Sequence, residues 1–122
     1  MRTHRFTIPF AYRLIDSVVT RLGKKSRPLR PGITVTPLVT VGDRIKLALL
    51  DYEPGAHVPR HRHPRAEIIY MLRGEQRDDC NTYGVGRLVI NRSGSDHEVN
   101  SPNGCRVMIY WREPVQFVGD PI

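Results

Sequence analysis

The stretch PGAHVPRHRHPRAEIIYMLRG, residues 54–74, places metal-binding side chains at spacings that suit one shared site. His61 and His63 are two residues apart, and side chains two apart point to the same face of a β-strand. Three residues then leave room for a bend before Glu67, which begins the next apolar run. Two imidazoles and a carboxylate that converge in this way form a three-point site for a divalent metal, and His97 offers a fourth donor further along the chain.

On both sides of this stretch, apolar and polar residues alternate with the period of β-strands. Proline, glycine, asparagine and aspartate separate the runs, and many short strands with turns between them are typical of an all-β sandwich or barrel. The runs lie near residues 33–38, 45–49, 57–62, 66–73, 86–91, 96–101 and 104–112.

The residues around the four donors resemble the two sequence motifs of the cupin family. The first motif is a glycine, five residues, His-x-His, three or four residues, Glu, six residues and a glycine. Every interval is matched, by Gly55, His61, His63, Glu67 and Gly74.

The second motif is a glycine, five residues, Pro-x-Gly, two residues, His, three residues and Asn. Gly86, Gly94 and His97 match it, whereas Arg92 replaces the proline and Asn100 falls one position early. These departures concern the geometry of a turn more than metal binding. The resemblance implies an all-β fold, the double-stranded β-helix or cupin jelly-roll barrel, over residues 32–122. It also implies that His61, His63, Glu67 and His97 are the metal ligands.

A narrower resemblance, to the ChrR-type cupins, is carried by the phrases PGITVTPL, LDYEPGAHVPRHRHPRAE and SPNGC. In some of those proteins the cupin is the sensor half of a zinc-dependent anti-sigma factor, whose helical half grips the sigma factor. Only about 30 residues precede the barrel here and none is a cysteine, so we do not expect this chain to bind a sigma factor in that way. Stand-alone relatives include iron-dependent dioxygenases that act on diketones or hydroxyketones.

Two functions therefore stay open. One is a metal-dependent dioxygenase-type oxidoreductase acting on a small oxygenated organic molecule. The other is a non-catalytic ChrR-like metallocupin that senses a ligand or an oxidant and acts through a protein partner. Isomerisation or epimerisation ranks lower, because no second carboxylate or lysine clearly faces the metal as a base. The expected cofactor is one divalent ion, Fe(II) or Zn(II), with Mn(II) and Ni(II) as further options.

Strand alternation also predicts which side chains line the pocket beside the metal. No catalytic residue is expected beyond the ligands. Cys105 is either a small buried apolar residue or a thiol that senses oxidants. His57 shares the alternation of His61 and could approach the site, whereas Tyr70 should point away. The expected lining is Ile69, Met71, Cys105, Val107, Ile109 and Trp111.

Positive charge is concentrated at the N-terminus. Residues 1–30 carry eight basic side chains and one acidic one, which accounts for the whole net charge of +7. We predict a basic N-terminal arm over residues 1–31. Residues 10–22 form a short amphipathic helix or, because Val18, Val19 and Thr20 favour extended backbone, a strand, and residues 23–32 form a loop. The arm is either a solvated tail or a contact for an acidic protein partner. No aromatic residue interleaves its Lys/Arg cluster, so we do not expect nucleic acid to bind.

The remaining expectations concern assembly and location. A long arm can cover an exposed sheet edge of a neighbour, so we predict a homodimer in which residues 1–40 cross the partner. No apolar run approaches the ~20 residues that span a bilayer, and no secretory signal is evident, so no membrane partner is expected. Two cysteines are too few for a disulfide scaffold. We expect a cytoplasmic protein.

Overall fold

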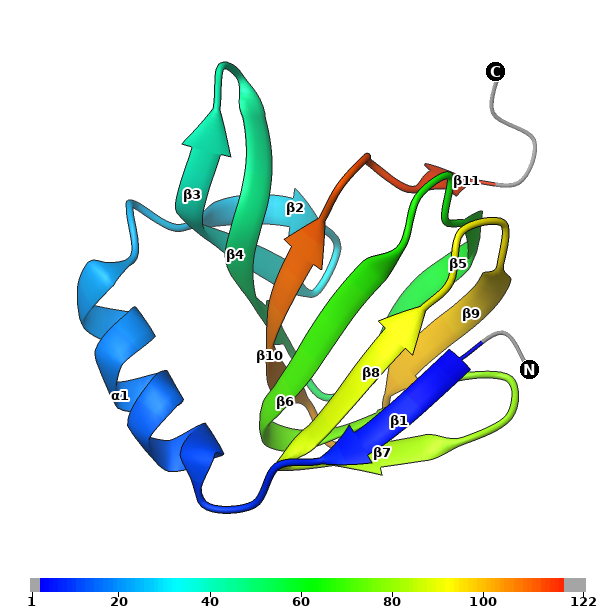
Figure 1. Ribbon diagram of the computed structural model, residues 1–122, viewed down its shortest axis with the longest axis horizontal. Coiled ribbons are helices and arrows are strands. Elements are labelled where there is room, and N and C mark those ends of the chain that lie inside the picture. Colours follow the sequence, from blue (N-terminus) through cyan, green and yellow to red (C-terminus); the bar gives the residue numbers. More distant parts are fainter. Residues whose placement is uncertain (1–2, 118–122) are drawn as a thin grey trace.

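Eleven antiparallel strands curl around a shared core in the computed structural model, which describes residues 3–117 (Figure 1). This confirms the predicted all-β cupin jelly roll. The strands are β1 (Thr3–Thr7), β2 (Arg27–Arg30), β3 (Ile33–Val41), β4 (Arg44–Tyr52), β5 (Ala56–Arg62), β6 (Glu67–Arg77), β7 (Thr82–Gly84), β8 (Arg87–Asn91), β9 (Asp96–Ser101), β10 (Cys105–Trp111) and β11 (Gln116–Phe117).

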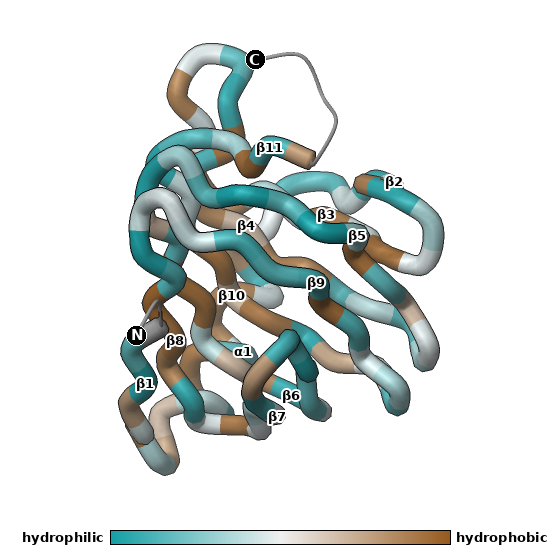
Figure 2. The backbone as a smooth tube through the Cα atoms, turned by 90° about the vertical axis from the view of Figure 1, so that its right-hand side faces the viewer, coloured by the Kyte–Doolittle hydropathy of each residue, from teal (hydrophilic) through white to brown (hydrophobic). Residues whose placement is uncertain are grey.

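Strand β6 joins the two layers of the barrel. Its first half pairs with β8 and β10, and β10 continues through β4 and β3 to β2. Its last residues pair with β7 and β9, and β9 continues through β5 to β11. Figure 2 shows β5 and β9 side by side, with β10 below them in that view. The two layers are therefore joined at the last residues of β6, and Glu67 begins the same strand at its opposite end.

The apolar run of β6 is buried on both faces, which explains why it is continuous rather than alternating. Ile69 and Met71 point into the barrel, where they join the main core. Tyr70 and Leu72 point outward and form a second cluster with Leu49. Tyr70 therefore faces away from the barrel interior, as its alternation predicts.

Helix α1 (Ala11–Leu22) covers that outward cluster. Tyr12, Ile15 and Val19 recur at helical spacing and pack against it, and this confirms the helix predicted at 10–22. The helix ends at Gly23, whose backbone N–H donates to the Val19 carbonyl at 3.0 Å.

A partly exposed ion network fastens the helix to the barrel. Asp16 accepts hydrogen bonds from Arg73 at 2.6 Å and from Arg106 at 2.9 Å. Arg106 also binds Asp51 at 2.7 Å, so one guanidinium joins α1, β10 and β4.

The other N-terminal segments also lie on the barrel of their own chain. Strand β1 pairs with β8, from Thr3 opposite Asn91 to Thr7 opposite Arg87. Residues 27–30, expected in a loop, form β2 beside β3. The edge of β8 is thus covered from within the chain, and an arm-exchanged homodimer remains a prediction.

Among residues 3–117, no helix has both the length and the apolar character needed to cross a membrane.

Candidate metal centre

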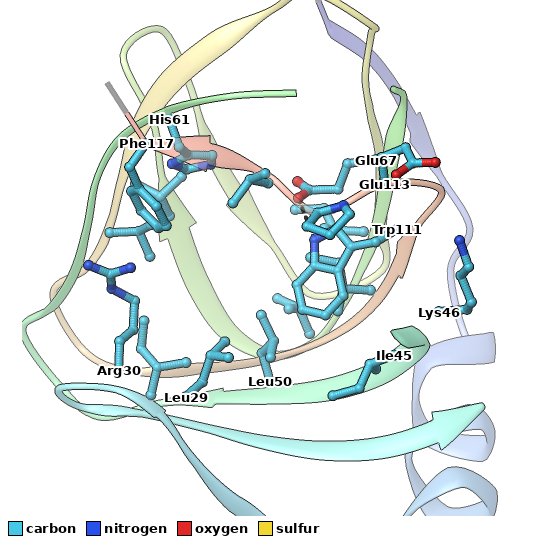
Figure 3. Close-up of a pocket in the computed structure, with 18 of the residues that line it drawn as sticks. Leu29, Arg30, Ile45, Lys46, Leu50, His61, Glu67, Trp111, Glu113 and Phe117 are labelled. Atoms are coloured by element: carbon cyan, nitrogen blue, oxygen red, sulfur yellow. Dashed lines mark hydrogen bonds between the residues drawn. The ribbon is translucent and has the colours of Figure 1, made fainter. Parts of the chain in front are cut away.

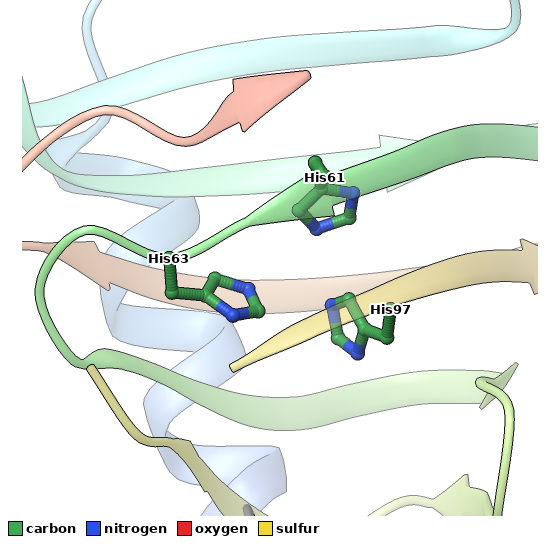
Figure 4. A group of neighbouring side chains, drawn as sticks. All are labelled: His61, His63 and His97. Atoms are coloured by element: carbon green, nitrogen blue, oxygen red, sulfur yellow. The ribbon is translucent and has the colours of Figure 1, made fainter. Parts of the chain in front are cut away.

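Three histidine side chains meet between the layers (Figure 4). His61 is on β5, His63 follows one residue after that strand, and His97 is on β9. Their ligand atoms all lie within 4.8 Å of one another, and the side chains are buried. The antiparallel register places His61 directly opposite His97, so strand pairing itself brings the two motifs together.

A bulge in β5 decides which histidines reach this centre. Val58 pairs with Val99 and His61 with His97, so the register shifts by one residue between Val58 and His61. An inserted residue reverses the in-and-out alternation of a strand. His57 therefore points outward, where its Nε2 lies 2.7 Å from Glu98. The prediction that His57 could approach the site is wrong for this reason.

Each histidine is held through its Nδ1 atom. His61 Nδ1 lies 2.8 Å from the Pro59 carbonyl oxygen, and His97 Nδ1 lies 3.4 Å from the Asp78 carboxylate. His63 Nδ1 lies 2.9 Å from the Ser95 hydroxyl, which itself donates to the Arg92 carbonyl. These acceptors place the proton on Nδ1 of each ring and leave the lone pair on Nε2.

Those lone pairs fit a metal ion. Nε2 of His63 and Nε2 of His97 are buried and have no hydrogen-bond partner within the described chain. Buried polar atoms are nearly always paired, so two adjacent exceptions need an explanation. Burial lowers the pKa of His61 to about 4, against the opposing effect of its bond to the Pro59 carbonyl. His61 is therefore neutral at pH 7, the form that binds metals.

Glu67 reaches the edge of the histidine group. One carboxylate oxygen lies 3.4 Å from His63 Nε2 and accepts a hydrogen bond from Asn91 at 3.0 Å. The other oxygen accepts from the indole N–H of Trp111 at 2.9 Å. Two N–H donors therefore orient the Glu67 carboxylate, which lies next to one of the three imidazoles.

A cavity of about 450 Å³ opens beside the centre (Figure 3). His61, His97 and Glu67 form part of its wall. Of the six residues expected to line it, four do so: Ile69, Val107, Ile109 and Trp111.

Met71 and Cys105 belong to the core and are not among the described residues that line the cavity. Cys105 begins β10, where it pairs with Gly74, and Met71 lies closer to that pairing than Ile69 does. Burial raises the pKa of the Cys105 thiol to about 11, so it is protonated at pH 7 and packs as a small apolar side chain.

Several functional contacts were not predicted from the sequence. Asp78 and Ser95, which hold two of the rings, lie in turns, and only the folded chain brings them to the histidines. Arg30, on the unexpected strand β2, lines the cavity. Asp78 directly follows the strand that begins with the predicted ligand Glu67, and that position in the sequence is the one signal that could have indicated it.

Comparisons with known proteins agree on a family and a fold. The model of the ChrR cupin-like domain family matches residues 17–115. A chain in the crystal structure of Rhodobacter sphaeroides SigE in complex with the anti-sigma ChrR is 26% identical, with a TM-score of 0.62 over 75% of this chain. This chain spans 49%, about half, of the length of that one.

Two enzymes share the fold at lower identity. An acetylacetone dioxygenase from Acinetobacter johnsonii is 17% identical, with a TM-score of 0.69 over 78% of this chain and 72% of its own. The polyketide cyclase RemF from Streptomyces resistomycificus is 21% identical, with a TM-score of 0.66 over 80% and 81% of the two chains. A search of curated proteins gave no match.

Proposed function

Because this chain belongs to the ChrR cupin-like family, we propose that it holds one divalent metal ion on His61, His63, Glu67 and His97 and acts as a dioxygenase-type oxidoreductase. The substrate is a small oxygenated organic molecule that enters the cavity. The observation that carries the metal site is a pair of buried Nε2 atoms, on His63 and His97, that have no hydrogen-bond partner among residues 3–117.

The donor set suits several ions. Three neutral imidazoles and one carboxylate are acceptable to Fe(II), Zn(II), Mn(II) and Ni(II), and Fe(II) or Zn(II) is our expectation. When bound, such an ion acts as a Lewis acid toward oxygen donors, and Fe(II) adds the capacity for dioxygen chemistry.

The protein's own groups orient the site and shelter it from water. The indole of Trp111 and the amide of Asn91 fix the Glu67 carboxylate from both sides. Ile69, Val107 and Ile109 present apolar surface to the cavity, which favours the carbon skeleton of a substrate over water.

Base-dependent isomerisation is less well supported. The lysine and one of the carboxylates that line the cavity form other contacts. Lys46 donates to the Arg112 carbonyl at 2.6 Å, and Glu113 binds Arg44 at 2.8 Å. We therefore assign no catalytic residue beyond the metal ligands.

Oxygen uptake tests the enzymatic proposal. Protein loaded anaerobically with Fe(II) should consume oxygen with at least one member of a panel of β-diketones and 2-hydroxyketones. The matched variant His97→Ala should lose both the iron and the uptake, whereas His57→Ala, on the outer face, should keep both. Iron-loaded protein that takes up no oxygen with any member of the panel would contradict the proposed dioxygenase activity. The retained iron would still support the proposed metal site.

A second candidate, a non-catalytic sensor that acts through a protein partner, is favoured by an exposed apolar stripe on α1. Leu14, Val18 and Leu22 of the helix are spaced four apart and have exposed fractions of 69%, 46% and 67%, and Phe10, just before the helix, is 86% exposed. Residues at this spacing follow one side of a helix, here the side next to the face of Ile15 and Val19 that packs on the barrel. The helix also carries Arg13 and Arg21. This surface suits a partner with an apolar groove and an acidic rim, or a second copy of the chain.

Hydrodynamic and binding measurements separate these assemblies. Light scattering at micromolar concentration should give twice the 14.0 kDa chain mass for the predicted homodimer, and Leu14→Glu should restore the monomer. If the neighbouring gene encodes a sigma factor, co-purification of that factor with wild type but not with Leu14→Glu would favour the sensor. Tightly held zinc without turnover would point the same way.

We also propose a cytoplasmic location, because Cys80 and Cys105 are both free thiols.

A further inference from the structure

Five cationic side chains line the cavity. Two acids, Asp43 and Glu113, line it as well, and Glu113 is bound to Arg44 at 2.8 Å. Most of the remaining lining residues are aliphatic or aromatic. The cationic lining residues are Arg27, Arg30, Arg44, Lys46 and Arg112.

Arg30 differs from the other cations in how it is held. It ends strand β2, is half-buried, and its guanidinium carbon lies 4.3 Å above the centre of the Phe117 ring. The Phe117 ring lies in turn 5.9 Å from the His61 ring. Figure 3 shows the three side chains along one side of the cavity. Within residues 3–117, no carboxylate forms a salt bridge with Arg30.

We propose that Arg30 is an anion-binding residue of this cavity, and that the ligand is an apolar organic acid. Its carboxylate meets the Arg30 guanidinium, while an oxygen-bearing group at its other end reaches the histidine centre. This assignment rests on the proposed metal site and names the substrate class for it.

The geometry supports a ligand of moderate length. The two ring distances place the guanidinium within about 10 Å of the His61 ring, which a substituted aromatic acid can span. Leu29, Leu50 and Val58 line the cavity as apolar surface for its carbon skeleton.

Electrostatics favour an anion at Arg30. Stacking on Phe117 holds the guanidinium plane before the ligand arrives, so less side-chain entropy is lost on binding. An arginine that is half-buried and lacks an acidic partner gains most from a carboxylate, which it can bind through two parallel hydrogen bonds. Arg44 is already paired and gains less.

A matched pair of probes tests the assignment. Co(II)-loaded protein would be titrated with 4-(3-oxobutanoyl)benzoate and with its methyl ester, which share the β-diketone and differ in the charge at the far end. Binding would be followed by the change in the cobalt absorption spectrum and by calorimetry. The variants are Arg30→Gln, Arg30→Lys and the control Arg13→Gln, which removes the same charge from helix α1, outside the lining of the cavity.

We expect wild type to bind the carboxylate about tenfold more tightly than the ester, as for one charge-assisted contact. Arg30→Gln should abolish that preference with unchanged cobalt content and affinity for the ester, Arg30→Lys should keep part of it, and Arg13→Gln should keep it. Equal binding of both probes by wild type, or equal loss in the Arg13 and Arg30 variants, would overturn the assignment. Failure to take up cobalt would instead overturn the metal site.

Discussion

Asp78 is predicted to set the metal affinity without touching the ion. Its Oδ2 faces His97 Nδ1 at 3.4 Å, and its Oδ1 accepts the backbone N–H groups of Cys80 and Asn81, both at 3.0 Å. Asp78→Asn retains an oxygen for the two backbone donors, so the turn should survive. The new amide donates toward His97, which favours the ring tautomer with its proton on Nε2 and removes the lone pair that the metal needs.

The expected loss follows from the length of that contact. Removing a group that orients a metal-binding histidine lowers affinity by about 10–100-fold, or roughly 1.4–2.8 kcal/mol. A separation of 3.4 Å is long for a hydrogen bond, so we expect the lower end, about tenfold.

Competition with a chelator such as EDTA or nitrilotriacetate measures this affinity with Zn(II) or Co(II). Asp79→Asn is the matched control, because Asp79 binds Arg60 and the Glu98 backbone but contacts no histidine. The melting temperature in excess EDTA should be similar for both variants. An Asp78→Asn affinity within twofold of wild type, or an equal fall in Asp79→Asn, would refute the positioning role.

Three further predictions concern the contacts of His57, Trp111 and Asp16. His57→Ala should leave zinc affinity within about twofold of wild type, because the bulge turns that ring outward; a tenfold fall in the chelator assay would place His57 at the site after all. Trp111→Phe removes the N–H donor to Glu67 and keeps most of the ring, so zinc affinity should fall several-fold; unchanged affinity would mean that Asn91 alone orients the carboxylate. Burial raises the pKa of Asp16, but hydrogen bonds from Arg73 and Arg106 outweigh it and hold the pKa below its usual value of 3.8. A depressed folded pKa stabilises the protein above pH 3.8 and that stability is lost as the pH falls further, so wild type should exceed Asp16→Asn in urea denaturation at pH 7 and approach it near pH 3. A gap that is independent of pH would show that the ion network contributes nothing through this charge.

The sequence predicts the histidine centre well because its geometry is local. His61 and His63 are two apart, and that spacing alone places them on one face. The arrival of His97 opposite His61 depends on the pairing of β5 with β9, which the resemblance to the cupin motifs supplies. The burial of Tyr70 outside the barrel likewise follows from alternation together with a helix on the outer face.

The misses arise where tertiary contacts override local spacing. A strict period of two cannot reveal the bulge that turns His57 away. Residues 27–30 contain arginine and proline and have the composition of a loop, yet they form β2 because β3 offers an edge to pair with. The place of Arg30 at the cavity depends on that pairing. Met71 and Cys105 have the correct inward orientation, and only their depth along the strands separates them from the cavity.

Metal stoichiometry tests the central claim most directly. Untagged protein purified anaerobically, and then equilibrated with Fe(II) or Zn(II) and desalted, would be analysed by elemental mass spectrometry beside His63→Ala and His57→Ala. The site predicts about one ion per chain in wild type and in His57→Ala, and almost none in His63→Ala. Wild-type protein without a retained ion, or equal ion content in all three proteins, would contradict a metal centre built on these histidines.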